Sequence, residues 1–247
     1  MRRDAAPELA SQPALAWLPR RLPRSLCVLC RTWCADGLCE ACVQRFAAPR
    51  PRCLRCARAT AAPLAACGGC LREPPAFERS VTLADYGAPW PALITAFKFR
   101  QQIELASALA AGLVCAVRRE HAVLPDLVVP VPLTAARLRE RGFNQAWEIA
   151  RRAARRLRRR ASRAVLQRVR ETAHQIGMTR GERERNLRDA FWVDARGRTS
   201  LAGLRVALVD DVMTTGATAH AASLALRRSG AAAVDLWVLA RTPLDDD

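Results

Sequence analysis

The stretch VALVDDVMTTGATA, residues 206–219, decides the fold class of this chain. It joins an apolar run typical of a buried strand to two adjacent aspartates, Asp210 and Asp211, and then to a turn rich in threonine. Two neighbouring carboxylates repel each other and are costly to remove from water. A strand that ends in this way needs cations or hydrogen-bond donors to offset that cost, so the stretch indicates a ligand site.

The segments on both sides of this stretch alternate between strand and helix patterns. Strands are predicted at 81–86, 126–133, 205–211 and 233–241, and helices at 91–100, 103–120, 144–159 and 217–230. Such alternation predicts an α/β fold with a mainly parallel sheet and helices on both faces. Ligands of these sheets bind at the carboxyl ends of the strands, which is where the two aspartates fall.

The turn after the aspartates has the composition of an anion site. A helix is expected to begin at about Ala217, so its positive end and free N–H groups face the turn. Thr214, Thr215 and Thr218 add hydroxyl donors, and Gly216 allows the backbone to approach a ligand closely. Carboxylates accept hydrogen bonds from a diol, so the ligand predicted for the whole stretch is a ribose 5-phosphate. The alternative is an acidic turn that only caps a helix.

Eight of the ten cysteines form four CxxC pairs near the beginning of the chain. The pairs are Cys27/Cys30, Cys39/Cys42, Cys53/Cys56 and Cys67/Cys70. Two CxxC turns can supply the four thiolates of a tetrahedral zinc site, so four pairs predict one or two structural zinc ions. The simplest pairing is sequential, and the spacing leaves an interleaved pairing open.

Other uses of the cysteines are less well supported. A disulfide framework requires an oxidising compartment, and the N-terminal segment has no signal-peptide pattern. A redox site of the thioredoxin type has one CxxC pair rather than four. Cys34 is a spare thiol that can substitute as a ligand, and Cys115 lies in an apolar helical pattern that predicts core packing.

The chain of 247 residues has a formal net charge of +17, and all but one of its 40 basic residues are arginines. The single lysine is Lys98. Residues 137–188 contain 17 arginines and 5 glutamates, which predicts either a solvated arginine surface or a polyanion-binding face. Within it, Ile149, Ala153 and Leu157 form an apolar stripe that predicts a helix lying on the core.

We expect three parts: a leader segment at 1–25, a cysteine-rich zinc-binding domain at 26–72 and an α/β domain at 80–247. Pro74 and Pro75 form a stiff linker between the last two. No run approaches the ~18 apolar residues that a membrane helix needs. These features predict a cytoplasmic protein without a transmembrane segment.

Several motifs in order resemble the ComF family. They are CVLC…LCEAC…RCLRC…CGGC, AFKFR, VVPVPLTAARLRERGFNQA, TAHQIGMTRGERERNLRDAF and VALVDDVMTTGATA. The last is similar to the 5-phosphoribosyl-1-pyrophosphate (PRPP) motif of type I phosphoribosyltransferases. The family includes competence proteins for DNA uptake and GntX-like proteins. The resemblance implies a double zinc ribbon on a phosphoribosyltransferase-type α/β domain and covers roughly residues 22 to 241.

The resemblance also implies roles for individual residues. Asp210 and Asp211 would hold the ribose hydroxyls, and Lys98 would face the pyrophosphate as the third catalytic residue. The 5-phosphate would be wrapped by Thr214, Thr215, Gly216, Ala217 and Thr218. The mobile loop that covers PRPP would carry Arg141, Gly142, Phe143, Asn144 and Gln145. A further family pattern, without an assigned role, matches Gln175, Arg183 and Asn186.

The implied activity is transfer of a phosphoribosyl group from PRPP with Mg²⁺ to an unidentified acceptor, with release of pyrophosphate. It would serve DNA uptake or nucleoside and nucleotide metabolism. An alternative is a non-catalytic adaptor that binds single-stranded DNA or a DNA helicase of the uptake machinery through the zinc head and the arginine-rich face. A redox enzyme is a third and weaker class.

Overall fold

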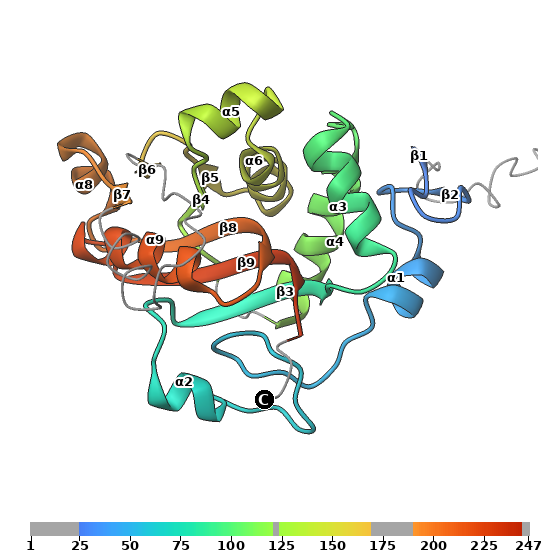
Figure 1. Cartoon of the computed structure of the whole chain (residues 1–247), viewed down its shortest axis with the longest axis horizontal. Coiled ribbons are helices and arrows are strands. Elements are labelled where there is room, and N and C mark those ends of the chain that lie inside the picture. Colours follow the sequence, from blue (N-terminus) through green and yellow to red (C-terminus); the bar gives the residue numbers. More distant parts are fainter. Residues whose placement is uncertain (1–24, 121–123, 169–189, 244–247) are drawn as a thin grey trace, which may run out of the picture.

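The computed structural model describes residues 25–120, 124–168 and 190–243, and the structural statements below concern those residues. Their centre is a five-stranded sheet in the order β3-β9-β8-β4-β5 (Figure 1). The strands are β3 (Arg79–Asp85), β9 (Ala233–Arg241), β8 (Arg205–Met213), β4 (Leu127–Pro130) and β5 (Arg160–Ala161). All neighbouring pairs are parallel, which confirms the predicted sheet and places β8 at its middle.

Helices cover both faces of the sheet, and each face has its own core (Figure 1). On β8, Ala207 and Val209 pack with α3 (Trp90–Phe99), α4 (Leu105–Glu120) and α6 (Gln145–Leu157). The alternate residues Val206 and Leu208 pack on the other face with α9 (Ala217–Arg228) and α8 (Ala195–Leu201). This alternation follows from the two-residue period of a strand. A short antiparallel pair, β6 (Gln167–Arg168) and β7 (Phe191–Trp192), borders the second face.

Helix α6 carries the stripe that the sequence predicts. Ile149 and Ala153 are fully buried and Leu157 is nearly so. The helix begins where the Asn144 side chain accepts a hydrogen bond from the backbone N–H of Trp147, at 3.2 Å. Such a side-chain cap satisfies one of the four N–H groups that have no partner inside a helix.

One helix near the site was not predicted. Helix α5 spans Ala135–Arg141, a segment without an apolar pattern of helical period. Thr134 caps its start by accepting from the N–H of Arg137, and Gly142 ends it with a φ of 76°. Threonine before a helix and glycine after it are common capping residues. However, α5 has no buried residue, so its sequence lacks the apolar periodicity from which a helix is predicted.

The cysteine-rich head lies against the α/β domain at two places. It contains the short strands β1 (Ser25–Leu26) and β2 (Trp33–Cys34) and the helices α1 (Glu40–Phe46) and α2 (Gly68–Arg72). Its first half packs on α4 so closely that a Cβ at Gly37 would lie 2.7 Å from the Cβ of Ala108. Its second half lies along the free edge of β3, where Ser80 N–H donates to the carbonyl of Leu54 at 2.9 Å. An otherwise unpaired sheet edge is thereby covered.

The prediction for Cys115 was wrong. Its side chain is exposed, whereas Leu113, Val114 and Val117 of the same helix are buried. Cys115 therefore lies on the solvent side of α4. None of the helices within the described residues has the length and apolar character to cross a membrane.

Candidate active site and candidate metal centres

The aspartate pair lies near the carboxyl end of the central strand. Strand β8 includes Asp210 and Asp211 and continues to Met213, and helix α9 begins at Ala217 after the predicted turn. Gly216 caps the helix with a φ of +85°, a conformation that residues with a Cβ rarely adopt. The Thr215 hydroxyl accepts a hydrogen bond from the N–H of Ala217 at 3.3 Å. The strand, the turn and the start of the helix therefore lie where the sequence predicts them, and anion binding by the turn stays a prediction.

Lys98 lies beside the pair although it comes from a distant part of the chain. Its Nζ is 2.7 Å from Oδ1 of Asp211, and the two side chains are 18% and 13% exposed. The lysine stands in the last turn of α3. The backbone N–H of Asp211 donates to Oδ1 of Asp210 at 2.9 Å. Three residues that the sequence placed in one site are therefore brought together.

Asp210 titrates near neutrality in this environment. Burial, followed by the charge of Asp211, raises the pKa of Asp210 to about 7. The hydrogen bond from the backbone of Asp211 and the positive charges of Lys98 and Arg168 act in the opposite direction. A carboxyl group of this kind can accept hydrogen bonds from sugar hydroxyls once it is ionised, and its charge can be changed by a small change in pH.

The RGFNQ motif packs against the helix that carries Lys98. Arg141 ends α5, and its guanidinium carbon lies 4.9 Å from the centre of the Phe99 ring. The Phe143 and Phe97 ring centres are 5.5 Å apart. The motif thus contacts the residues on both sides of Lys98, and Gly142 joins its two halves in the left-handed conformation. Movement of this segment over a ligand stays a prediction.

Asn144 and Gln145, the last two residues of the motif, form hydrogen bonds that hold it in place. The Asn144 side chain donates to the carbonyl of Val131 at 3.1 Å, just beyond β4. Gln145 is buried and accepts from Arg141 through Oε1 at 3.2 Å. The motif is therefore fixed to the carboxyl end of the strand next to β8. The pattern residues Gln175, Arg183 and Asn186 lie outside the described residues.

The eight paired cysteines form two groups of four. The first consists of Cys27, Cys30, Cys39 and Cys42, and the second of Cys53, Cys56, Cys67 and Cys70. Within each group the sulfurs lie within 4.8 Å of one another, so the structure has the sequential pairing. Cys34 belongs to neither group.

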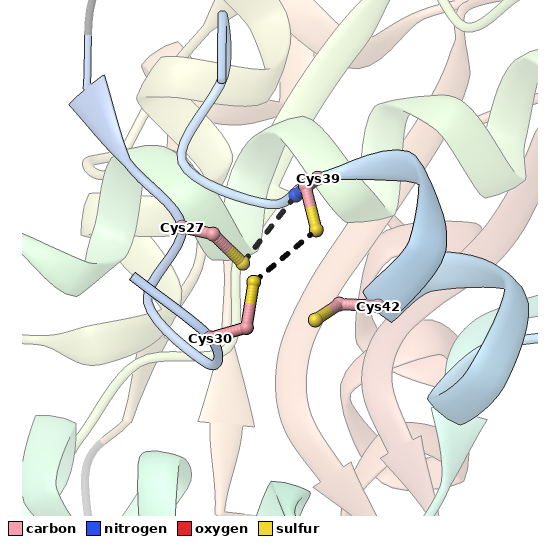
Figure 2. Close-up of side chains that lie close together, drawn as sticks. All are labelled: Cys27, Cys30, Cys39 and Cys42. Atoms are coloured by element: carbon pink, nitrogen blue, oxygen red, sulfur yellow. Dashed lines mark hydrogen bonds between the residues drawn. The ribbon is translucent and has the colours of Figure 1, made fainter. Parts of the chain in front are cut away.

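The sulfur positions fit tetrahedral zinc. Zn–S bonds of ~2.3 Å place two ligand sulfurs roughly 3.8 Å apart. The sulfurs of Cys30 and Cys39 are 3.5 Å apart (Figure 2), and those of Cys56 and Cys67 are 3.7 Å apart. An N–H to sulfur bond recurs in both groups, from Cys39 to Cys27 at 3.5 Å in the first. These groups are compatible with structural zinc.

Sequence reasoning missed two basic residues beside the site. Arg241, at the end of β9, donates to the carbonyl groups of Met213 and Thr214 at the start of the turn. Arg168 lies close enough to Asp210 for its positive charge to lower the pKa of that carboxyl group. In a chain with so many arginines the residue type gave no signal, and only the end of a predicted strand marked Arg241.

The chain is similar to several competence and DNA utilization proteins. The chain is 37% identical to the DNA utilization protein YhgH of Escherichia coli K12 over 224 residues, which cover 88% of this chain and 97% of the relative. It is 36% identical to competence protein F of Haemophilus influenzae over 83% of this chain and 91% of the relative. Competence protein ComFC of Bacillus subtilis is 28% identical over 70% of this chain and 68% of the relative. No protein-family model matches the chain.

Among solved structures, the glutamine PRPP amidotransferase of B. subtilis aligns with a TM-score of 0.40 and 21% identity. The alignment covers 58% of this chain and 30% of that protein. So loose an alignment carries no argument about the site. The α/β class and the two cysteine groups are confirmed instead by the parallel strand order and the sulfur positions.

Proposed function

The chain belongs to the ComF family of competence and DNA utilization proteins, and from this premise we propose that it binds PRPP with Mg²⁺ at the end of β8. The observation that carries the proposal is the Lys98–Asp211 ion pair beside the turn after Met213. A cation, a pair of carboxylates and the N-terminal end of α9 converge there. PRPP has a matching set of groups, namely a pyrophosphate, a ribose diol and a 5-phosphate.

Each part of the ligand has a chemically suited partner. Asp210 and Asp211 would accept hydrogen bonds from the ribose hydroxyls. The turn of Thr214, Thr215 and Gly216, with Ala217 and Thr218 in the first turn of α9, would surround the 5-phosphate. Lys98 would turn from Asp211 to the pyrophosphate, for which a compact ammonium is suited. Partial burial of the aspartates would strengthen these contacts.

The reaction supported by this arrangement is phosphoribosyl transfer. The bond between the anomeric carbon and the pyrophosphate oxygen would break, and a bond to the acceptor nucleophile would form. When bound, Mg²⁺ would neutralise charge on the pyrophosphate and ribose oxygens. The protein would hold the ribose, offset charge and require no covalent nucleophile of its own.

A calorimetric titration of the zinc-loaded chain with PRPP and Mg²⁺ tests the proposal. We expect saturable binding that is abolished when Asp210→Asn and Asp211→Asn are combined. Asp126→Asn serves as the control, since Asp126 lies at the opposite end of β8 and accepts from the N–H of Arg205. Equal affinity in the double variant and the wild type would exclude the site. Acceptors can then be screened by pyrophosphate release.

A second candidate function is binding of single-stranded DNA, which the names of the relatives favour. Part of the predicted arginine face is already engaged within the protein, since Arg152 pairs with Glu148 and Arg156 with Asp36. Exposed arginines remain at the end of α6 and beyond it, and these are Arg155, Arg158, Arg159 and Arg160. They would form an electrostatic contact surface for phosphates.

Salt dependence tests this second candidate. Single-strand binding should weaken linearly with the logarithm of salt concentration. Removing Arg158 and Arg159 together should reduce both the affinity and the slope. Removing Arg227 and Arg228, at the far end of α9, removes the same number of charges and is the control. A slope that is unchanged in the first variant would place DNA binding elsewhere.

A further inference from the structure

Arg241 connects the second cysteine group to the turn of the candidate site. The side chain ends β9 and is 2% exposed. Its Nε donates to the carbonyl oxygen of Cys56 at 2.9 Å. One terminal nitrogen donates to the carbonyl oxygens of Met213 at 3.2 Å and Thr214 at 2.5 Å. The guanidinium of Arg241 is thus hydrogen-bonded both to the backbone of Cys56 and to the backbone at the start of the turn.

The backbone next to Arg241 strengthens the same connection. The N–H of Thr242 donates to the carbonyl of Met213 at 3.0 Å, and its hydroxyl donates to the same oxygen at 3.2 Å. These bonds keep the end of β8 beside the end of β9. Arg241 is therefore seated between fixed backbone segments rather than in a solvent-filled space.

The linker after the head contacts the other side of the turn. The N–H of Ala76 donates to Nδ1 of His220, in the first turn of α9, at 3.2 Å. The Phe77 ring is buried and lies 4.0 Å from the position of a Cβ at Gly216. The turn therefore has contacts with the head side of the molecule at its start and at its end.

We propose that Arg241 is a positioning residue that makes the shape of the turn after β8 depend on metal binding at Cys53, Cys56, Cys67 and Cys70. This inference rests on the proposed function in one respect, since it treats that turn as the phosphate subsite of PRPP. Binding of zinc orders the loop that contains the Cys56 carbonyl. Because Arg241 donates to the Cys56 carbonyl and to the carbonyls of Met213 and Thr214, an ordered loop keeps these two carbonyls in place. The backbone N–H groups of the turn after Thr214 then keep their orientation toward an anion.

The first cysteine group provides an internal contrast. It lies on α4 and α6, where Gly37 contacts Ala108 and Asp36 pairs with Arg156. No hydrogen bond between this group and residues 213–218 is found within the described residues. Loss of metal from the first group is therefore expected to destabilise the head without changing the turn.

The first test measures the turn directly, by hydrogen exchange at the amides of Ala217 and His220. These amides are bonded to the Thr215 hydroxyl and to the Gly216 carbonyl. Exchange should be about 10-fold faster in Arg241→Met and in Cys53→Ser than in the wild type, because the hydrogen bonds that the guanidinium donates to the turn are lost or loosened. It should be unchanged in Cys30→Ser, which removes a ligand of the first group.

The second test measures PRPP affinity by calorimetry in the same variants. We expect about 10-fold weaker binding in Arg241→Met and in Cys53→Ser, because hydrogen bonds from a charged group that hold the turn are lost or loosened. The double variant should bind no more weakly than either single variant, because both changes break one connection. Arg79→Met is the matched control: Arg79 donates to the carbonyl of Glu120, away from the turn. It should lower stability without changing affinity.

The two measurements separate the inference from the proposed function. Faster exchange in Arg241→Met and Cys53→Ser with no PRPP binding by the wild type would retain the connection and reject the ligand. Unchanged exchange in both variants, with PRPP bound normally, would overturn the connection and leave the ligand assignment intact. If Arg241→Met does not fold, Arg241→Lys and Cys53→Ser leave the same comparison in place.

Discussion

Lys98 and Asp211 form an ion pair of 2.7 Å that joins the last turn of α3 to the central strand. Their position at the carboxyl edge of a parallel sheet agrees with the general location of ligand sites in such folds. Both side chains are largely shielded from water, so the pair is screened less than one on the surface. The pair connects two motifs that the sequence keeps far apart.

Replacing Lys98 should weaken PRPP binding more than it weakens the fold. Lys98→Met removes the cation that would meet the pyrophosphate, and we expect a loss of about 10-fold or more in affinity by calorimetry. Lys98→Arg should also bind more weakly, because a planar guanidinium does not replace a compact ammonium. Arg228→Met removes a charge at the far end of α9 and should bind normally. Wild-type affinity in Lys98→Met would remove Lys98 from the site.

The raised pKa of Asp210 predicts how stability changes with pH. The folded state holds a proton on Asp210 up to about pH 7, whereas an unfolded aspartate releases it near its ordinary pKa of about 4. The contribution of this group is therefore present at low pH and is lost as pH rises through 7. From pH 5 to 8 the wild type should lose about 3 kcal/mol relative to Asp210→Asn, because pH 5 lies two units below the folded pKa. Denaturant unfolding at both pH values measures this difference.

A stability difference that does not change with pH would contradict the prediction for Asp210. If Asp210→Asn and the wild type keep a constant difference from pH 5 to 8, the carboxyl is not titrating in this range. PRPP binding gives a second readout. If the ionised form accepts the ribose hydroxyls, apparent affinity should fall by about tenfold for each pH unit below 7, and titrations across this range would show it.

Gly216 offers a test of the turn itself. Its φ of +85° makes Gly216→Ala strained, with an expected cost of roughly 1 kcal/mol in thermal unfolding. Gly203 has a φ of +74° with open space around it, so Gly203→Ala should cost a similar amount. Only Gly216→Ala should weaken PRPP binding. Equal affinities in the two variants would show that the turn does not hold the phosphate.

The sequence predicted what depends on local pattern. The strand, the aspartate pair and the helix that starts at Ala217 lie within one short segment, so their order in the chain determines their arrangement. The CxxC pairs predicted the metal groups in the same way. The resemblance placed Lys98, whose contact with Asp211 is a tertiary contact that local pattern does not contain.

Features that depend on packing between distant segments were harder to predict. Cys115 was predicted to lie in the core because its neighbours are apolar. It is exposed, because its position on α4 falls on the side of the helix that faces solvent. Arg241 is one arginine among many, and its role follows from β9 ending beside the Cys56 carbonyl and the turn. Helix α5 was not predicted, because it is short and has no buried residue, so only its capping residues could have indicated it.

The pairing of the cysteines can be tested by zinc content. The structure predicts two zinc ions per chain, one in each group. A double variant of Cys27→Ser and Cys42→Ser removes two ligands from the same group, so one ion should remain. A double variant of Cys42→Ser and Cys70→Ser removes one ligand from each group, so both ions should be lost or bound more weakly.

An interleaved pairing would give a different result, because Cys27 and Cys42 would then belong to different sites and their double variant would lose both ions. Cys34→Ser is the control and should keep two ions, since Cys34 lies outside both groups. Loss of an ion should also lower the free energy of unfolding by an amount on the order of several kcal/mol, because metal binding and folding are coupled. Elemental analysis of the purified variants, followed by thermal unfolding, distinguishes the two pairings.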